Sequence, residues 1–207
     1  MNQIVGLFPT PLMRRERLLP EALLEALLAQ YGKRASQVNA QSDRLSHTEI
    51  LRPDATEELR QVGQLVLPRL VEFGAMLFGE PLEWSIKELW INVLQTGGQQ
   101  SIHNHANSFV SGVIYLTRSH ASANTVFVKS LGGSGFVFSN RHQGTAAGPF
   151  NTEKWIMPEV SPGDLILFPS HLLHEVPSNQ GDERVTLAFN AIPARLDSWG
   201  YTIQFSK

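Results

Sequence analysis

The sequence contains no cysteine, and this absence excludes disulfide bonds and thiolate metal sites. A chain that needs no oxidising environment fits a reducing compartment, so we expect a cytoplasmic protein. The N-terminal stretch also lacks a basic region followed by an apolar one, and Pro9 and Pro11 interrupt it. We therefore expect neither a signal peptide nor a membrane anchor there.

The sequence also lacks a large excess of positive or negative charge. The 17 basic and 19 acidic residues give a formal net charge of -2. A nucleic-acid surface needs a basic stripe, so we expect no nucleic-acid partner. No apolar run approaches the roughly 20 residues that cross a bilayer, and the sequence therefore predicts no membrane partner.

What the sequence does have is enough length and apolar content for a packed core. Its 207 residues are 42% hydrophobic, which is typical of a globular domain. We interpret residues 1–207 as a single domain. Residues 1–82 are expected to form a helical flank with an edge strand over Gln3–Phe8, and residues 83–207 the β-rich core.

The first part of the chain shows the periodicity of helices. Apolar residues recur at helical spacing over residues 19–31 and again over residues 53–78, so two helices are predicted there. Asp54 is a candidate N-cap for the second helix. The polar stretch over residues 33–48 lies between them and is interpreted as a loop.

From Trp84 the apolar period changes to two, which is typical of β-strands. Residues 84–94 are predicted as a long strand that ends in a turn at Gly97-Gly98. Further strands are predicted over residues 109–117, 125–129, 135–139, 154–157, 165–168, 184–190 and 200–205. Many short strands after two helices predict a mainly β fold, a jelly roll or small barrel with flanking N-terminal helices.

Three histidines form a candidate metal site. His103 and His105 are spaced i and i+2, which places both imidazoles on one face of a strand. His174 follows an apolar strand far downstream and can join them if the sheet curls. Imidazoles suit Fe, Zn, Ni or Cu. The alternative is that two of the three are ordinary polar core residues. The remaining histidines are expected at the surface: His47, His120, His142 and His171.

Arg184 is a candidate anion-binding residue. It lies on the strand after His174, with Thr186 on the same strand face. A guanidinium inside a barrel mouth needs an anion, and its fork matches a carboxylate. Tyr115 can bring its hydroxyl to the same carboxylate. The alternative is a surface ion pair between Arg184 and its neighbour Glu183 or Asp182.

These motifs together resemble a known superfamily. The motifs are His103-Asn-His105, Ser111-Gly-Val-Ile-Tyr-Leu116, Pro162-Gly-Asp-Leu-Ile-Leu-Phe-Pro-Ser170, His174-Glu-Val-Pro177 and Arg184-Val-Thr186. In this order they resemble the 2-oxoglutarate/Fe(II)-dependent oxygenase superfamily, and within it the prolyl-hydroxylase-like branch. With Trp90-Ile-Asn92 and Phe189-Asn190 added, the chain is most similar to a bacterial and phage group of such oxygenases. The resemblance covers residues 90–190.

The resemblance implies a double-stranded β-helix, also called a jelly roll or cupin-like fold, with Fe(II) at its open end. His103 and His174 match the two metal histidines of the superfamily. Arg184 matches the basic residue that binds the C5 carboxylate of the cosubstrate 2-oxoglutarate. Thr186 and Tyr115 match the hydroxyl residues that share this carboxylate.

One position departs from the common pattern, because the superfamily usually has H-x-D or H-x-E where this chain has His105. A three-histidine site is one charge more positive, and it can hold Fe(II), Zn or Ni. We predict that His103, His105 and His174 bind one metal and carry the catalysis. Asn92 and Asn190 match polar positions that line the cosubstrate pocket.

The predicted function is an Fe(II)- and 2-oxoglutarate-dependent dioxygenase that hydroxylates an unidentified small-molecule or peptide substrate. One alternative is a three-histidine dioxygenase that does not use 2-oxoglutarate, with Arg184 holding the substrate's own carboxylate. Another is a non-enzymatic, cupin-like module that binds a metal or small molecule, because a fold alone does not fix an activity. The sequence leaves the oligomeric state open, with a homodimer as one option.

Overall fold

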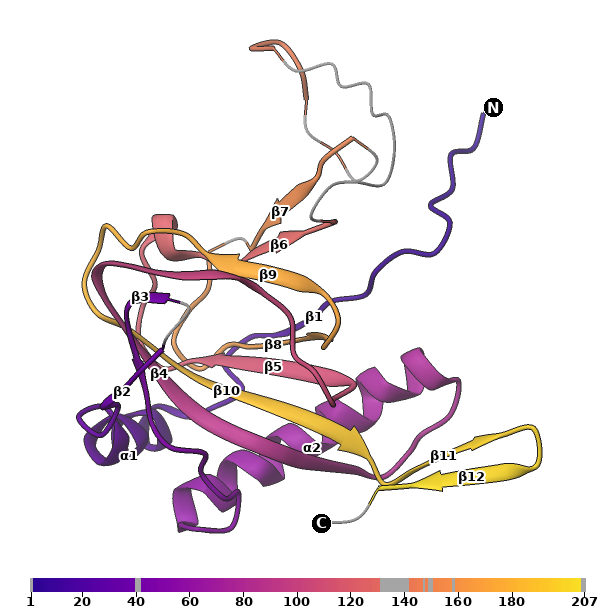
Figure 1. Cartoon of the computed structure of the whole chain (residues 1–207), viewed down its shortest axis with the longest axis horizontal. Coiled ribbons are helices and arrows are strands. Elements are labelled where there is room, and N and C mark those ends of the chain that lie inside the picture. The colour runs from indigo at the N-terminus through magenta and orange to yellow at the C-terminus, as the bar shows by residue number, and fades with distance from the viewer. Residues whose placement is uncertain are drawn as a thin grey trace.

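A computed structural model describes residues 2–39, 42–130, 142–146, 148, 151–157 and 159–205. In this part of the chain, two helices lie against a large antiparallel sheet that curls over on itself (Figure 1). The protein is therefore mainly β, a jelly roll with N-terminal helices, as predicted. The strand predicted over residues 135–139 lies outside the described residues.

The helices are α1 (Glu21–Tyr31), α2 (Glu57–Phe78) and the short 3-10 helix η1 (Ala121–Ala123). The strands are β1 (Met13–Arg15), β2 (Gln37–Val38), β3 (Ser42–His47), β4 (Trp84–His103), β5 (Val110–Tyr115), β6 (Val126–Val128), β7 (Lys154–Ile156), β8 (Leu165–Pro169), β9 (Leu173–Val176), β10 (Arg184–Pro193), β11 (Arg195–Ser198) and β12 (Tyr201–Gln204).

Both predicted helices form, but the N-cap of α2 is not the predicted one. The side chain of Thr56 accepts a hydrogen bond from the backbone N–H of Leu59 and so caps the first turn. Asp54 lies too early in the chain, and its carboxylate binds the guanidinium of Arg52 at 2.9 Å. Of the helices in the described residues, none is long and apolar enough to span a membrane.

The polar stretch over residues 33–48 is not a plain loop, and this prediction was wrong. It contains β2 and β3, and β3 pairs with β4 in antiparallel register, with Leu45 opposite Leu94 and His47 opposite Asn92. The free hydrogen-bonding edge of β4 orders this segment, although its side chains have low strand propensity.

The edge strand predicted over Gln3–Phe8 is also wrong, because these residues are exposed and adopt no regular structure. The first strand is β1, which pairs with β8. The fully buried carboxylate of Asp164 holds this strand: it accepts hydrogen bonds from the Arg14 guanidinium at 2.8 Å and from the backbone N–H of Arg17 at 2.9 Å.

The strands of the large sheet follow the order β1-β8-β5-β10-β4-β9-β6-β7. The first part of β4 pairs with β10 and its last part pairs with β9. The turn predicted at Gly97-Gly98 is therefore wrong, because β4 continues through it as a bend. Gly97 has φ of 79°, and backbone hydrogen bonds join both glycines to Asn179. These glycines let one strand pass from one half of the sheet into the other.

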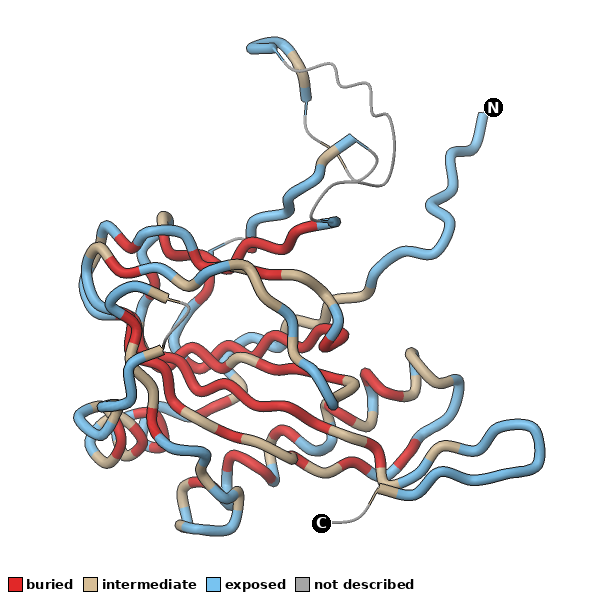
Figure 2. The backbone as a smooth tube through the Cα atoms, in the orientation of Figure 1, coloured by how far each residue is buried: buried red, intermediate tan, exposed pale blue. Residues whose placement is uncertain are grey.

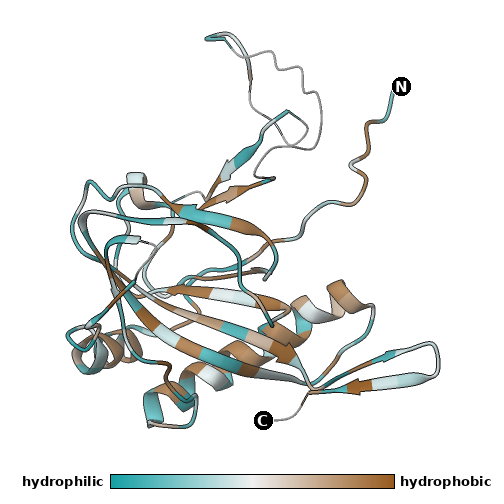
Figure 3. Ribbon diagram, viewed as in Figure 1, coloured by the Kyte–Doolittle hydropathy of each residue, from teal (hydrophilic) through white to brown (hydrophobic). Residues whose placement is uncertain are grey.

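The central strand β10 is buried on both faces, as Figure 2 shows in red. On one face, Val185, Leu187 and Phe189 join the hydrophobic core formed with α1 and α2. On the other face, Arg184 and Thr186 are buried polar residues. Hydrophobic and polar bands alternate along the strand in Figure 3. Strand alternation thus separates a structural core from a polar interior, which is where the candidate site lies.

Candidate metal centre

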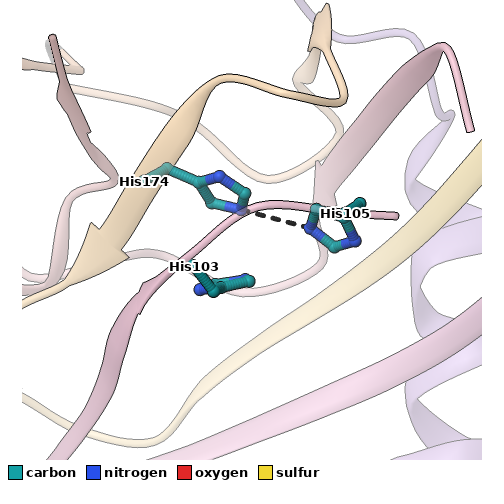
Figure 4. A group of neighbouring side chains, drawn as sticks. All are labelled: His103, His105 and His174. Carbon is teal, nitrogen blue, oxygen red and sulfur yellow. Dashed lines mark hydrogen bonds between the residues drawn. The ribbon is translucent and has the colours of Figure 1, made fainter. Parts of the chain in front are cut away.

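The structure brings His103, His105 and His174 together. His103 is the last residue of β4 and lies opposite His174 of β9 in the antiparallel register. Nitrogen atoms from the three rings lie within 4.8 Å of one another. Figure 4 shows the imidazoles converging from β4, from the segment after it and from β9. Such a cluster is compact enough for one metal ion, since metal–nitrogen bonds are about 2.0–2.2 Å long.

Strand alternation is not what aligns His105 with His103, because β4 ends at His103. Instead, the backbone N–H of His105 donates a hydrogen bond to the carbonyl oxygen of Ser170 at 2.9 Å. Ser170 follows β8 directly. The expected strand phase was therefore the wrong reason for this contact, and a tertiary hydrogen bond holds His105 in place.

Backbone carbonyls fix the ring tautomers of two of the histidines. The Nδ1 atom of His103 lies 2.7 Å from the carbonyl oxygen of Ser101, and that of His174 lies 2.9 Å from the carbonyl oxygen of Leu172. A carbonyl oxygen only accepts, so each Nδ1 carries the proton and each Nε2 keeps its lone pair. The Nε2 atom of His105 lies 3.2 Å from that of His174. This donor set fits a divalent cation.

Burial keeps the cluster neutral. Burial first, and then the positive charge that His103 can carry, lower the pKa of His174 to about 3 and that of His105 to about 4. Burial also lowers the pKa of His103 itself. At neutral pH all three imidazoles are therefore uncharged, and the neutral imidazole is the form that binds metals.

Aromatic side chains enclose the cluster. The ring centroid of Phe168 lies 4.8 Å from that of His174 in an edge-on arrangement. The centroid of Trp90 lies 5.8 Å from that of His105. These rings limit rotation of the imidazoles and give the centre an apolar wall, which lowers the local dielectric constant.

The predicted cosubstrate residues share one surface, the inner face of the central strands. Asn92 of β4, Thr186 of β10 and Tyr115 of β5 lie side by side in register, and all three are buried. Arg184 lies one inward-facing position from Thr186 on β10, opposite Leu94. The sheet thus brings together residues that the sequence separates widely.

Arg184 is buried, with 4% of its surface exposed, so it does not form the surface pair with Asp182 or Glu183. Its guanidinium carbon lies 5.2 Å from the ring centroid of Tyr115. Its Nε has no hydrogen-bond partner, and no carboxylate in the described residues pairs with it. Burial lowers the pKa of Arg184, while Tyr115 raises it. A buried cation without a counter-ion is costly, so this position fits an anionic group.

Two predicted pocket residues already have protein partners. The hydroxyl of Tyr115 lies 2.9 Å from Oγ1 of Thr125. The amide of Asn190 donates to Oε2 of Glu88 at 2.9 Å and accepts from the hydroxyl of Ser111 at 2.8 Å. Asn190 therefore belongs to a hydrogen-bonded network next to the site.

Sequence reasoning missed several residues of this interior. Glu88 and Trp90 share a strand face with Asn92, and their i, i+2 and i+4 spacing was the available signal. Ser111 and Ser170 lie inside recognised motifs but received no role. Of the other histidines, three are exposed as expected: His120, His142 and His171. The surface expectation was wrong for the half-buried His47, whose strand position pairs with Asn92.

Comparison with protein families gives one match. Residues 88–190 match the family described as "Putative 2OG-Fe(II) oxygenase". This range contains every residue of the candidate site. No curated protein sequence matches the chain.

Several solved structures share the fold. HygX from Streptomyces hygroscopicus, crystallised with nickel and 2-oxoglutarate, has a TM-score of 0.62 at 15% identity, and the alignment covers 89% of this chain and 83% of HygX. A prolyl-4-hydroxylase from Pseudomonas putida has a TM-score of 0.56 at 20% identity, with 87% and 92% of the two chains covered. The non-heme alpha-ketoglutarate-dependent epimerase SnoN from nogalamycin biosynthesis has a TM-score of 0.62 at 12% identity, with 90% and 80% covered.

Proposed function

The chain belongs to the 2-oxoglutarate/Fe(II)-dependent oxygenase superfamily, and from this premise we propose that it hydroxylates a C–H bond of a small-molecule or peptide substrate. One observation carries the proposal. A cluster of neutral imidazoles and a buried guanidinium without a counter-ion face the same barrel interior. The first fits Fe(II) and the second fits the far carboxylate of 2-oxoglutarate.

We propose that the metal ligands are the Nε2 atoms of His103, His105 and His174. The backbone carbonyls at Nδ1 of His103 and His174 orient these rings and increase their basicity. A set of three protein ligands leaves coordination positions for small ligands. Bound Fe(II) and 2-oxoglutarate together supply the oxidising chemistry.

Arg184 is the proposed partner of the C5 carboxylate of 2-oxoglutarate. Its fork can form two parallel charge-assisted hydrogen bonds with this group. The hydroxyls of Thr186 and Tyr115 lie on neighbouring strands in the same row and complete the carboxylate site. Asn92 and Asn190 are the proposed polar residues that line the pocket. Together these residues orient the cosubstrate between the guanidinium and the histidine cluster.

We also propose that residues 1–207 work as one domain. Side chains of α1 and α2 and the outward-facing side chains of β4, β5, β8 and β10 form a single hydrophobic cluster. Residues 1–82 and 83–207 therefore share a core, and the helical flank supports the strands that carry the site.

A second candidate function is a dioxygenase that does not need 2-oxoglutarate. The observation that favours it is His105, which stands where the superfamily usually has a carboxylate. In that case Arg184 holds a carboxylate of the substrate itself.

The experiment separates these functions by their products. The purified protein is loaded with Fe(II) without oxygen, 2-oxoglutarate is titrated in, and oxygen is then admitted. We expect a visible metal-to-ligand charge-transfer band. With ascorbate added as the two-electron reductant in place of the unidentified substrate, succinate and CO2 then follow, and both the band and the products are lost in His174→Ala. Oxygen uptake with a carboxylate substrate but no dependence on 2-oxoglutarate supports the second candidate. No oxygen consumption with metal bound supports a binding module and contradicts both.

A further inference from the structure

A carboxylate that the proposed function does not use lies next to the histidine cluster. Glu88 is on the inner face of β4, one inward-facing position before Trp90, whose ring contacts His105. The side chain of Glu88 is 34% exposed, and its carboxylate accepts a hydrogen bond from the buried amide of Asn190.

Glu88 is held in its ionised form. Partial burial raises its pKa, but hydrogen bonds from Asn190 and Lys87 and the positive charge of Lys87 outweigh burial, so the pKa is lowered overall. The ion pair with Lys87 has a distance of 3.0 Å and uses Oε1. The other oxygen, Oε2, accepts from Asn190, which is 3% exposed. Glu88 is therefore more than a surface ion pair.

A directional hydrogen-bonded chain runs from Glu88 across the sheet. A carboxylate only accepts, so the amide nitrogen of Asn190 must face it, at 2.9 Å. The amide oxygen of Asn190 then accepts from the hydroxyl of Ser111 at 2.8 Å. With its proton used, the Ser111 hydroxyl accepts from that of Ser170 at 2.9 Å. Glu88 thus sets the direction of every bond in the chain.

The other end of the chain reaches the metal centre. The backbone carbonyl of Ser170 accepts the hydrogen bond that holds His105 beyond the end of β4. Asn190, Ser111 and Ser170 are all buried, so an unpartnered group anywhere in this chain would be costly. The position of His105 therefore depends on a buried series of hydrogen bonds that starts at Glu88.

We infer that Glu88 is a positioning residue for the metal centre. Glu88 supplies a negative charge that the three-histidine ligand set lacks, and it orients the buried hydrogen-bonded chain that holds His105. The inference rests on the proposed metal site. Three neutral imidazoles leave the full double charge on a divalent ion, and in a low-dielectric interior a nearby carboxylate lowers the energy of that charge. The same carboxylate weakens the attraction between the ion and incoming anions.

The test measures metal binding directly. Metal-free protein is titrated with Co²⁺ and followed by its visible absorption, for wild type, Glu88→Gln and the control Glu175→Gln. Glu175 follows His174 in sequence, but its carboxylate pairs with Lys154 at 2.6 Å, away from the cluster. We expect Glu88→Gln to bind Co²⁺ roughly tenfold to a hundredfold more weakly, and Glu175→Gln to bind like wild type.

A second measurement separates the charge of Glu88 from a purely structural role. Azide is titrated into the Co²⁺-loaded proteins. Loss of a nearby negative charge should make Glu88→Gln bind azide severalfold more tightly, although it binds the metal more weakly. A variant that merely distorts the site would bind both more weakly, and that result would overturn the charge role.

Two further variants complete the design. Ser111→Ala breaks the hydrogen-bonded chain but keeps the charge of Glu88, so we expect weaker Co²⁺ binding with unchanged azide affinity. Ser111→Ala also tests the hydrogen-bonded chain if Glu88→Gln does not fold. If Ser111→Ala binds Co²⁺ with wild-type affinity, the hydrogen-bonded chain does not position His105. If His174→Ala loses Co²⁺ while Glu88→Gln binds it like wild type, the role of Glu88 is overturned and the proposed metal site stands. Unchanged Co²⁺ binding in His174→Ala overturns the proposed metal site and the inference with it.

Discussion

The Nε2 atoms of His105 and His174 lie 3.2 Å apart, although 69 positions separate the two residues in the chain. His174 points its lone pair into this space because its Nδ1 proton is bound to the carbonyl of Leu172. Two ring nitrogens at this distance must share either a proton or a cation. The folded chain thus already holds two of the three proposed metal ligands close enough together to bind one ion.

The first prediction concerns His105. His105→Ala should lose most of its Fe(II), since it removes one of three proposed ligands. His105→Asp should keep or strengthen Fe(II) binding, because a carboxylate adds the negative charge that a hard cation favours. Metal content is measured by elemental analysis after equal anaerobic loading, with the exposed His171→Ala as the control. Equal iron in wild type and His105→Ala would leave only His103 and His174 as ligands.

The second prediction concerns the anion site. Arg184→Ala should weaken 2-oxoglutarate binding roughly tenfold to a hundredfold, because a charge-assisted hydrogen bond contributes about 1.5–3 kcal/mol. Calorimetric titration of the metal-loaded, oxygen-free protein measures this. The control is Arg118→Ala, since Arg118 is exposed and pairs with Glu159 at the surface. Unchanged affinity in Arg184→Ala would place the anion site elsewhere.

The third prediction is a loss of stability in the metal-free protein as the pH falls. Above about pH 6.5, the unperturbed value for histidine, His105 and His174 are neutral in both the folded and the unfolded chain. Below it they bind protons only in the unfolded chain, because burial holds the folded pKa values at about 4 and about 3. The free energy of unfolding should therefore decrease between about pH 6.5 and pH 3.

Denaturant unfolding at a series of pH values checks this, with His174→Leu for comparison. Each histidine contributes up to about 1.4 kcal/mol per pH unit across its window, so the variant should show a shallower decrease than wild type. Parallel curves for the two proteins between pH 6.5 and 4 would mean that His174 titrates normally in the folded state.

The fourth prediction compares two glycines. A Cβ at Gly112 would lie 2.1 Å from Cζ of the buried Phe189 ring, so Gly112→Ala should lower the free energy of unfolding by about 1–3 kcal/mol. A Cβ at Gly63 in α2 would meet no atom within 4 Å, so Gly63→Ala should raise it by about 0.5–1 kcal/mol. Chemical denaturation of both variants measures the difference. Equal stability would contradict the close packing of Phe189 on Gly112.

Periodicity and spacing predicted much of the fold, and they singled out three histidines that the structure places together. The helices α1 and α2 have strong apolar patterns, the buried strand β8 is rich in Leu and Ile, and apolar residues alternate with others at Val185, Leu187 and Phe189 of β10. These signals are local, so they can be seen in the sequence. The motif spacing also placed Arg184 on an inward strand face, and its burial agrees with that.

The elements that were missed depend on contacts between distant segments. β3 has a polar sequence and forms because β4 offers it a free edge. Gly97 and Gly98 looked like a turn, but hydrogen bonds to Asn179 hold them as a bend within one strand. The part played by Glu88 could not be predicted either, since its partner Asn190 lies 102 positions away.

The continuity of β4 has a consequence for how the protein matures. One strand carries Glu88 and Asn92 beside β10 and delivers His103 to β9. If only one half of the sheet has formed, either Asn92 is in place beside β10 or His103 is in place beside β9, but not both. The proposed metal site is therefore complete only when both halves of the sheet have formed, so β4 couples metal binding to folding.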